Sequence, residues 1–377
     1  MTIKKSTESE GQISRRKALG YTLAGVGGCL LPTGLAGCVS DGLTGQPGEM
    51  QATGANIGVA NTVIPYTRGA GRYTNWKTHC VGRYLVDTPS DAIVTHYPFI
   101  NNNDFNVIQG KTPEVAAKMA DAKITEFKNM RHDTEGNCFI KSIPLANGGV
   151  LVHGRKRNYS TESGWAFLYI PVSSQEGTNI YVYKETVFDF EQENTLQKLV
   201  AFGSSFKAFP TGTIPTEAGF CFENILIAYV PFSEESGIGI DDPKVPGLRS
   251  SFGTRSLHGS TPWRWLTQRV DLTERCRNIQ LRGSCDRLRF GKHDAGIIPG
   301  EEVCLAGKHE GRRTYTFKWD NPGTLQSKTA PQIEATILYQ EPPFDQPTAP
   351  TPFASDKEAL EVWDKFVSTI RIRPVMS

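Results

Sequence analysis

The sequence predicts an α+β fold of two domains, each a mainly antiparallel sheet with packed helices. Its 377 residues exceed what one ordinary hydrophobic core accommodates. Most apolar runs are short, and 37 glycines and 23 prolines are spread among them, which is typical of many strands joined by turns. Aromatic residues make up 10% of the chain, enough to fill packed cores.

The first 37 residues predict an export signal rather than a structural element. Arg15 and Arg16 precede an apolar run over 18–36 that ends in small residues. A basic start, a short apolar segment and small residues before a cleavage point are the marks of a secretory signal. Paired arginines also fit the twin-arginine route, so both export routes stay open.

The end of this run predicts a lipid anchor. Leu35-Ala36-Gly37-Cys38 is typical of a bacterial lipobox, in which Cys38 is acylated and becomes the new N-terminus. The alternative is an uncleaved transmembrane helix, but 18–36 is barely long enough, and its glycines and Pro32 disfavour a helix. Val39 stands where inner-membrane lipoproteins carry Asp, which favours the inner leaflet of the outer membrane.

The charge balance excludes a nucleic-acid partner. The whole chain has 41 basic and 39 acidic residues, and removal of residues 1–37 leaves 36 and 37. A nearly neutral protein has no electrostatic reason to bind nucleic acid or to press against anionic lipid. We therefore expect membrane attachment only through the lipid on Cys38.

We expect a flexible tether over 38–62 and a first domain over 63–235. The tether carries hardly a large apolar side chain and cannot form a core. Thr112-Pro113 places a capping hydroxyl before a proline at the first helical position, and an apolar stripe continues to about 131. A second helix is expected over 191–202. Strands are expected at 80–87, 92–99, 138–143, 149–153, 165–172, 179–187, 219–222 and 225–230.

We expect an interdomain segment over 236–262 and a second domain over 263–377. From 233 to 263 the composition shifts to Ser, Gly, Asp and Pro, which favours a loop. Ser355 and Glu358 form a capping-box signature before a helix with a broad apolar face. Strands are expected at 263–270, 279–281, 286–290, 302–305, 313–319 and 332–339, and a proline-rich connector at 342–352.

Six cysteines remain after export and can pair in an oxidising compartment. Their spacing leaves 15 connectivities open, among which Cys276–Cys285 is the favoured local disulfide. A structural zinc site is the alternative, but there is no Cys-x-x-Cys spacing and no complementary histidine pair. The six are Cys80, Cys138, Cys221, Cys276, Cys285 and Cys304.

No motif predicts catalysis, so we expect no catalytic, cofactor-binding or metal-binding residues. The sequence has no Gly-x-Ser-x-Gly, no phosphate-binding loop and no His-Glu-x-x-His. Ser204 and Lys207 match Ser-x-x-Lys but lack the companion Lys-Thr-Gly motif. The seven histidines are scattered singly. The residues alone favour a binding protein over an enzyme.

Two segments resemble a known family. The first is Gly82-Arg83-Tyr84-Leu85-Val86-Asp87-Thr88-Pro89. The second runs through Ile298-Pro299-Gly300-Glu301-Glu302, Tyr315-Thr316-Phe317-Lys318-Trp319 and Pro331-Gln332-Ile333. In this order and spacing they resemble the type VI lipase immunity proteins, over about residues 76–340.

The resemblance implies a periplasmic protein of a Gram-negative bacterium that blocks a secreted phospholipase effector and is not itself an enzyme. It also implies two domains arranged as a claw around that partner. Recognition often lies in loops on a rigid scaffold, so the predicted loop 234–263, with Asp241, Arg249 and Arg255, is the first candidate for the contact surface. The alternatives are a periplasmic hydrolase with a noncontiguous site, and a solute-binding or scaffold lipoprotein of the envelope.

Overall fold

The computed structural model describes residues 75–375 except 102, 133–135, 157–162, 176, 230–232, 244–246, 259, 273–284, 310, 328 and 340–351. All of them belong to one compact unit, Tyr66–Ser377. The predicted export signal, the lipidation site at Cys38 and the tether lie outside the described residues. Within the described part, no helix is both long and apolar enough to cross a membrane.

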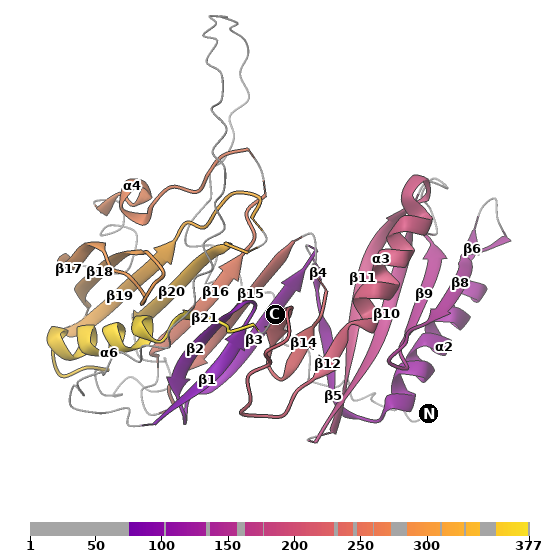
Figure 1. The fold of residues 1–377 in the computed structure, drawn as a ribbon, viewed down its shortest axis with the longest axis horizontal. Coiled ribbons are helices and arrows are strands. Elements are labelled where there is room, and N and C mark those ends of the chain that lie inside the picture. Colours follow the sequence, from indigo (N-terminus) through magenta and orange to yellow (C-terminus); the bar gives the residue numbers. More distant parts are fainter. Residues whose placement is uncertain are drawn as a thin grey trace, which may run out of the picture. The chain divides into compact units, whose positions relative to one another are not determined.

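A five-stranded antiparallel sheet lies between two helices (Figure 1). Helix α2 (Pro113–Asn129) packs Ala116, Ala120 and Phe127 on one face, and α3 (Gln192–Ser204) packs Leu196, Leu199 and Phe202 on the other. Each strand alternates its side chains between the faces, so the two helices share one sheet. The strand order is β5 (Asn106–Lys111), β11 (Gly177–Phe188), β10 (Ser163–Ser174), β9 (Val150–Arg155) and β8 (Phe139–Pro144).

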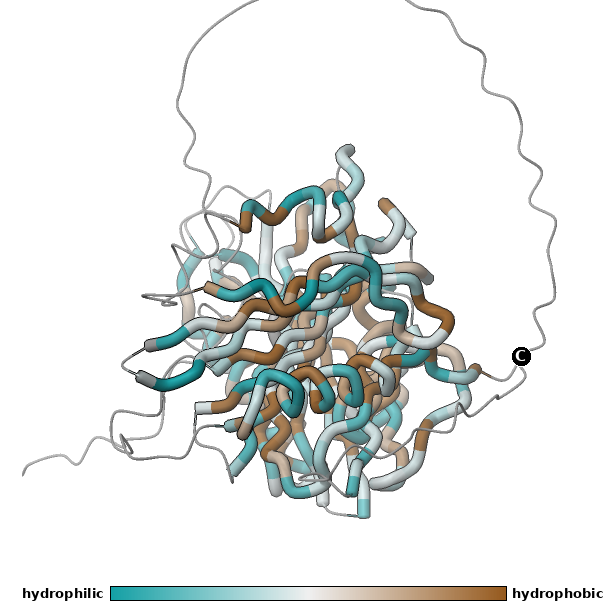
Figure 2. Tube along the Cα trace, turned by 90° about the vertical axis from the view of Figure 1, so that its left-hand side faces the viewer, coloured by the Kyte–Doolittle hydropathy of each residue, from teal (hydrophilic) through white to brown (hydrophobic). Residues whose placement is uncertain are grey.

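An eight-stranded antiparallel sheet contains the other large core, and α6 (Asp356–Ser368) packs on it. Figure 2 shows hydrophobic and hydrophilic positions alternating along the strands. On α6, Trp363, Phe366 and Val367 are buried in this core. The strand order is β17 (Cys285–Lys292), β18 (Glu301–His309), β19 (Arg312–Asn321), β20 (Gln332–Tyr339), β16 (Arg249–Arg255), β15 (Glu234–Asp241), β3 (Ile93–Ile100) and β4 (Asn103–Asp104).

Three small sheets and two short helices complete the described elements. The first sheet is β1 (Trp76–Val81), β2 (Tyr84–Pro89) and β21 (Arg371–Ile372). The second is β12 (Phe206–Ala208), β14 (Ile225–Ile227) and β13 (Phe220–Phe222). The remaining elements are β6 (Arg131–His132), β7 (Gly136–Asn137), η1 (Asp189–Glu191) and α4 (Leu266–Arg269).

The predicted helices are confirmed because their signals are local. Thr112 is the N-cap of α2, and proline follows at the first helical position. At α6 the Ser355 hydroxyl accepts a hydrogen bond from the Glu358 backbone N–H, as a capping box requires. The Glu358 carboxylate accepts from the N–H of Ala354 rather than from that of the N-cap residue.

The expectation of a loop over the interdomain segment 236–262 is wrong, because this range contains strands. Its residues contribute β15 and β16, which pair with each other and with β3 and β20 in the middle of the eight-stranded sheet. Ile238 and Ile240 of β15 are buried in the core. The glycines of β15 and β16 give these two strands a weak intrinsic strand propensity, but pairing with β3 and β20 stabilises them. The predicted strand 263–270 is also wrong, because α4 lies there; 279–281 is outside the described residues.

Gly300 is a position where this fold tolerates no side chain. A Cβ atom there would lie 2.2 Å from Nε1 of the fully buried Trp319. The same indole N–H donates a hydrogen bond to the carbonyl of His293, so the ring has little freedom to move away.

We predict that Gly300→Ala lowers the free energy of unfolding by about 2–3 kcal/mol, because overpacking displaces Trp319. Chemical denaturation followed by tryptophan fluorescence measures this. Gly253→Ala is the matched control, since its Cβ would meet only ordinary contacts, the nearest at 3.4 Å. Equal stability losses in both variants would contradict the account.

Candidate functional site

The structure places the three predicted contact residues at two ends of one strand pair. Asp241 and Arg249 are directly opposite each other where β15 and β16 meet, and both are exposed. Ile93, 60% exposed, pairs with Asp241 from the neighbouring strand. Arg255 lies at the far end and holds Glu235 in a two-bond ion pair of 2.9 and 3.1 Å. The structure therefore brings Asp241 and Arg249 together and leaves Arg255 apart.

A small hollow lies beside the Asp241 end of this strand pair. Its volume is about 30 Å³, and its walls include Trp76, Ala92, Ile240 and Leu248. That is room for one or two water molecules. Drug-sized ligands occupy pockets of about 300–1,000 Å³, so this hollow is not a substrate site.

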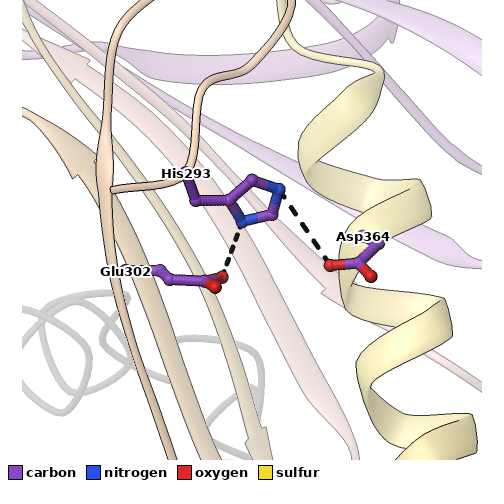
Figure 3. Close-up of side chains that lie close together, drawn as sticks. All are labelled: His293, Glu302 and Asp364. Carbon is purple, nitrogen blue, oxygen red and sulfur yellow. Dashed lines mark hydrogen bonds and ion pairs between the residues drawn. The ribbon is translucent and has the colours of Figure 1, made fainter. Parts of the chain in front are cut away.

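A cluster of ionisable groups joins α6 to the eight-stranded sheet (Figure 3). The His293 Nδ1 atom lies 2.6 Å from the Glu302 carboxylate, and its Nε2 lies 4.0 Å from Asp364 on α6. Arg289 on β17 donates two hydrogen bonds to Asp364, at 2.5 and 2.8 Å. The Trp363 indole donates to the buried Glu302 at 2.8 Å. These contacts fix the position of the helix on the sheet.

The cluster is suited to structure rather than chemistry. Burial alone would raise the pKa of the Glu302 carboxyl, but hydrogen bonds from His293 and Trp363 and the charge of Arg289 hold that pKa below its usual range. The thiol of Cys304 lies 3.6 Å from Glu302, and burial together with that carboxylate raises its pKa. A protonated thiol is a poor nucleophile.

His293, Glu302 and Asp364 offer three ligand atoms within 4.8 Å of one another, a separation that a metal ion could bridge. Arg289 already supplies the positive charge, and its guanidinium occupies the open side of Asp364. The residues fit an internal ion network better than a metal centre.

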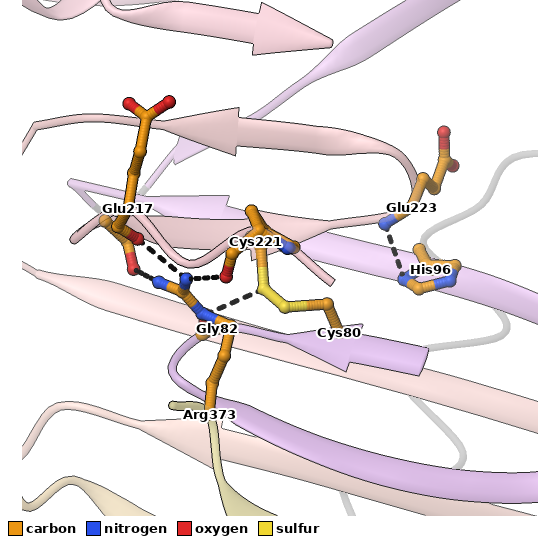
Figure 4. Close-up of a disulfide and its surroundings, with 9 residues drawn as sticks. Cys80, Gly82, His96, Glu217, Cys221, Glu223 and Arg373 are labelled. Carbon is orange, nitrogen blue, oxygen red and sulfur yellow. Dashed lines mark hydrogen bonds between the residues drawn. A yellow bond between two sulfur atoms is a disulfide. The ribbon is translucent and has the colours of Figure 1, made fainter. Parts of the chain in front are cut away.

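The second cluster surrounds a disulfide between β1 and β13 (Figure 4). Cys80 and Cys221 are bonded across 141 residues of sequence, with Cα atoms 5.7 Å apart. Gly82 and Cys221 exchange backbone hydrogen bonds of 2.7 and 2.9 Å beside it. Gly82 has a φ of 63°, and a Cβ there would also lie 2.9 Å from Thr254, so glycine is required at this turn.

Arg373, near the C-terminus, closes this cluster. Its side chain is 2% exposed, and its guanidinium donates hydrogen bonds to the carbonyls of Pro215, Glu217 and Gly219. A charge buried this deeply requires such partners, because desolvation opposes it. The arginine thus fixes the segment that leads into β13.

The cysteine predictions have mixed outcomes. The Cys80–Cys221 bond was not predicted, since the spacing of six cysteines does not select a connectivity. Cys285 takes part in a disulfide, and Cys276 lies outside the described residues, so their pairing stays a prediction. Cys138 and Cys304 are buried and take part in no described disulfide.

The Ser-x-x-Lys match forms no catalytic pair. The Lys207 ammonium donates to Glu217 at 2.5 Å, and the Ser204 hydroxyl accepts from the backbone N–H of Ala146 at 3.3 Å. The two side chains therefore have separate partners.

Family models place the chain in a class of bacterial immunity proteins. The model for the Tle cognate immunity protein 4 N-terminal domain matches residues 77–170, and the model for its C-terminal domain matches residues 213–375. Together they cover more than half of the sequence. A comparison with curated proteins finds no match.

Solved structures agree with this class. The apo immunity protein TplEi of the type VI secretion system of Pseudomonas aeruginosa is 30% identical, with a TM-score of 0.70, over 80% of this chain and 99% of that one. A chain of the Tle4–Tli4 complex has the same identity and coverage, with a TM-score of 0.67. TplEi bound to an "L" peptide is 31% identical, with a TM-score of 0.66.

The chain belongs to the Tle cognate immunity protein 4 family of type VI lipase immunity proteins. The family expected from the sequence is confirmed, and the protein is an immunity protein rather than an enzyme. The hydrolase alternative is therefore wrong. The fold is mainly antiparallel β with few helices, matched by two family domains.

Two half-buried histidines near the disulfide make the stability dependent on pH. His79 and His96 have ring centroids 5.9 Å apart, and His96 Nδ1 accepts a hydrogen bond from the Glu223 backbone N–H. Burial, with the nearby charge of Lys77, lowers the pKa of His79 to about 4. Burial and the neighbouring His79 and Lys77 lower the pKa of His96 to about 3.

We predict that the free energy of unfolding falls by about 1–2 kcal/mol per pH unit between pH 6 and 4. Unfolded histidine has a pKa near 6.5, whereas His79 and His96 have lower pKa values in the folded protein. Below pH 6.5 the unfolded chain therefore binds more protons than the folded protein, and this favours unfolding. Above it these groups contribute no pH dependence. Denaturation midpoints at pH 8, 6 and 4.5 measure this.

His96→Gln should reduce this pH slope, whereas the exposed His258→Gln should leave it unchanged. His153 is fully buried, and burial lowers its pKa to about 4. This histidine therefore accounts for part of the remaining pH slope. A His96→Gln variant with the full wild-type slope would show that this pair does not set it.

Proposed function

We propose that this protein binds a Tle4-type phospholipase effector and inhibits it by covering its catalytic pocket. The observation that carries the proposal is the 30% identity to a chain of the Tle4–Tli4 complex over 99% of that chain. Inhibition of this kind needs a buried anchor and a complementary rim, and requires no catalytic group in the inhibitor. The claw arrangement of two domains around the effector is part of this proposal.

The proposed site of action is the periplasm, with the protein held to a membrane by lipid on Cys38. The lipobox over 35–38 supports the anchor. The Cys80–Cys221 disulfide supports an oxidising compartment, because cytosolic proteins rarely keep structural disulfides. A tethered inhibitor has a higher effective concentration at the bilayer that a phospholipase attacks.

We propose Asp241 and Arg249 as contact residues at the exposed end of β15 and β16. Their opposite charges and the exposed Ile93 beside them give an apolar centre with a charged rim. Arg255 is a weaker candidate, because its guanidinium is already held by Glu235.

The protein should protect cells against its cognate Tle4-type lipase. Expressing that lipase in the periplasm should lyse cells, and co-expression of this chain should restore growth and give a co-purifying complex. Cys38→Ser should retain binding by the purified protein but protect less at low expression, since the local concentration falls. Lysis at every expression level of the wild-type chain would refute the proposal.

Charge reversal at Asp241 and Arg249 tests the contact residues. We expect Asp241→Arg combined with Arg249→Glu to weaken lipase binding by about 10-fold or more, as the loss of an interface charge pair does. Biolayer interferometry with the immobilised lipase measures the Kd. Arg312→Glu is the control, a charge reversal on another strand of the same sheet. Unchanged binding of the double variant would remove this end of the sheet from the interface.

A further inference from the structure

Within the described part of the chain, no helix covers part of one face of the five-stranded sheet. Helix α2 covers Val152, Tyr169 and Ile180 on this face, together with the side of Phe167 that meets Phe127. Beyond the helix the same face continues through Trp165 on β10 and Lys184 and Phe188 on β11. Alternation along β11 puts positions 184, 186 and 188 on one face, over about 13 Å. We call this the β10–β11 face.

Lysine side chains lie over the aromatic rings of this face. The Lys184 ammonium lies 3.5 Å from the centre of the Trp165 ring, and that of Lys156 lies 4.1 Å from it. Lys123 from α2 lies 4.6 Å from the Phe167 ring. Such cation–π contacts hold the ammonium groups in fixed positions on a rigid sheet.

Lys184 is the cation of this group that is available to a partner. Lys123 is paired with Glu126 at 2.5 Å, whereas within the described part of the chain no carboxylate forms an ion pair with Lys184. Partial burial and the like charges of Lys123 and Lys156 lower the pKa of Lys184. An approaching anion would relieve this repulsion.

Two exposed phenylalanines border the lysines at the end of β11. Phe188 is 48% exposed and Phe190 is 80% exposed, and their ring centroids are 5.7 Å apart. Aromatic residues are enriched at protein interfaces and in their hot spots, so an exposed aromatic pair beside fixed charges is typical of a binding surface.

The charges around these rings favour a protein partner over a membrane. Asp189, Glu191 and Glu193 flank Phe190 in sequence. Their carboxylates would be repelled by anionic phospholipid where the phenylalanines would have to insert. A protein surface can instead place acidic groups over Lys184 and apolar groups over Phe188 and Phe190.

We propose that the β10–β11 face is a docking surface for an acidic, partly apolar segment of the lipase effector. This rests on the proposed function and names a surface for it. Lys184 receives a carboxylate of the effector, and Phe188 with Phe190 forms the apolar anchor beside it.

The test compares matched variants of the full chain in binding to the cognate Tle4-type lipase. We expect Lys184→Glu to raise the Kd about 10-fold and to weaken the dependence of binding on salt. Phe188→Ser with Phe190→Ser should raise the Kd about 30-fold. One control is Lys198→Glu on α3, the helix that covers the opposite face of the sheet. The other is Ile297→Ser, which replaces an apolar side chain that is 80% exposed and lies outside the β10–β11 face. Both should stay within about twofold of wild type, with circular dichroism confirming that every variant folds.

Three outcomes would overturn the proposal. If wild type binds the lipase and the Lys184 and Phe188/Phe190 variants bind equally well, this face is not the docking surface, while the proposed function stands. If wild type does not bind the lipase, both proposals fail. If Lys184→Glu, in the Cys38→Ser background, leaves lipase binding intact but abolishes sedimentation with phosphatidylglycerol vesicles, the face binds membrane instead.

Discussion

The junction around Cys80, Cys221 and Arg373 is the constraint on which the surrounding structure depends. It joins parts of the chain that lie far apart in sequence, and bringing such parts together costs conformational entropy. The disulfide lowers that cost by restricting the unfolded chain, by about 4–5 kcal/mol for a loop of this length in the chain-entropy account. Two small three-stranded sheets, β1-β2-β21 and β12-β14-β13, meet there, and an isolated bridge between Gly82 and Cys221 connects them.

The buried charges of the described residues all have polar or charged partners. Arg373 has three carbonyl acceptors, and Glu302 has donors from His293 and Trp363. The buried Asp320 is paired with Arg269 from α4. Each pair or network links an element to a sheet, so the cost of removing charge from water is offset by partners that also fix position. The network around Glu302 and the apolar contacts of α6 together fix this helix on the eight-stranded sheet.

Local signals in the sequence predicted local structure, and the failures were nonlocal. Pro113 and Ser355 marked helix starts correctly because capping involves only neighbouring residues. The range 236–262 was misjudged because Gly237, Gly239 and Gly253 disfavour strands in isolation, whereas β3 and β20 make them strands in the fold. The family was identifiable because its motifs are short local segments. The Cys80–Cys221 bond and the proximity of Lys123 to Lys184 could not be predicted, because each joins residues far apart in sequence.

The position of Arg373 has a consequence for the timing of folding. Strand β21 completes the sheet beside β2, and Arg373 binds carbonyls of the segment 215–219, so the last residues of the chain close contacts with its early ones. Residues up to Arg373 must leave the ribosome before these contacts can form. Long-range closure of this kind is slow. The junction around Arg373 therefore closes late, after the two sheets that it joins have been synthesised.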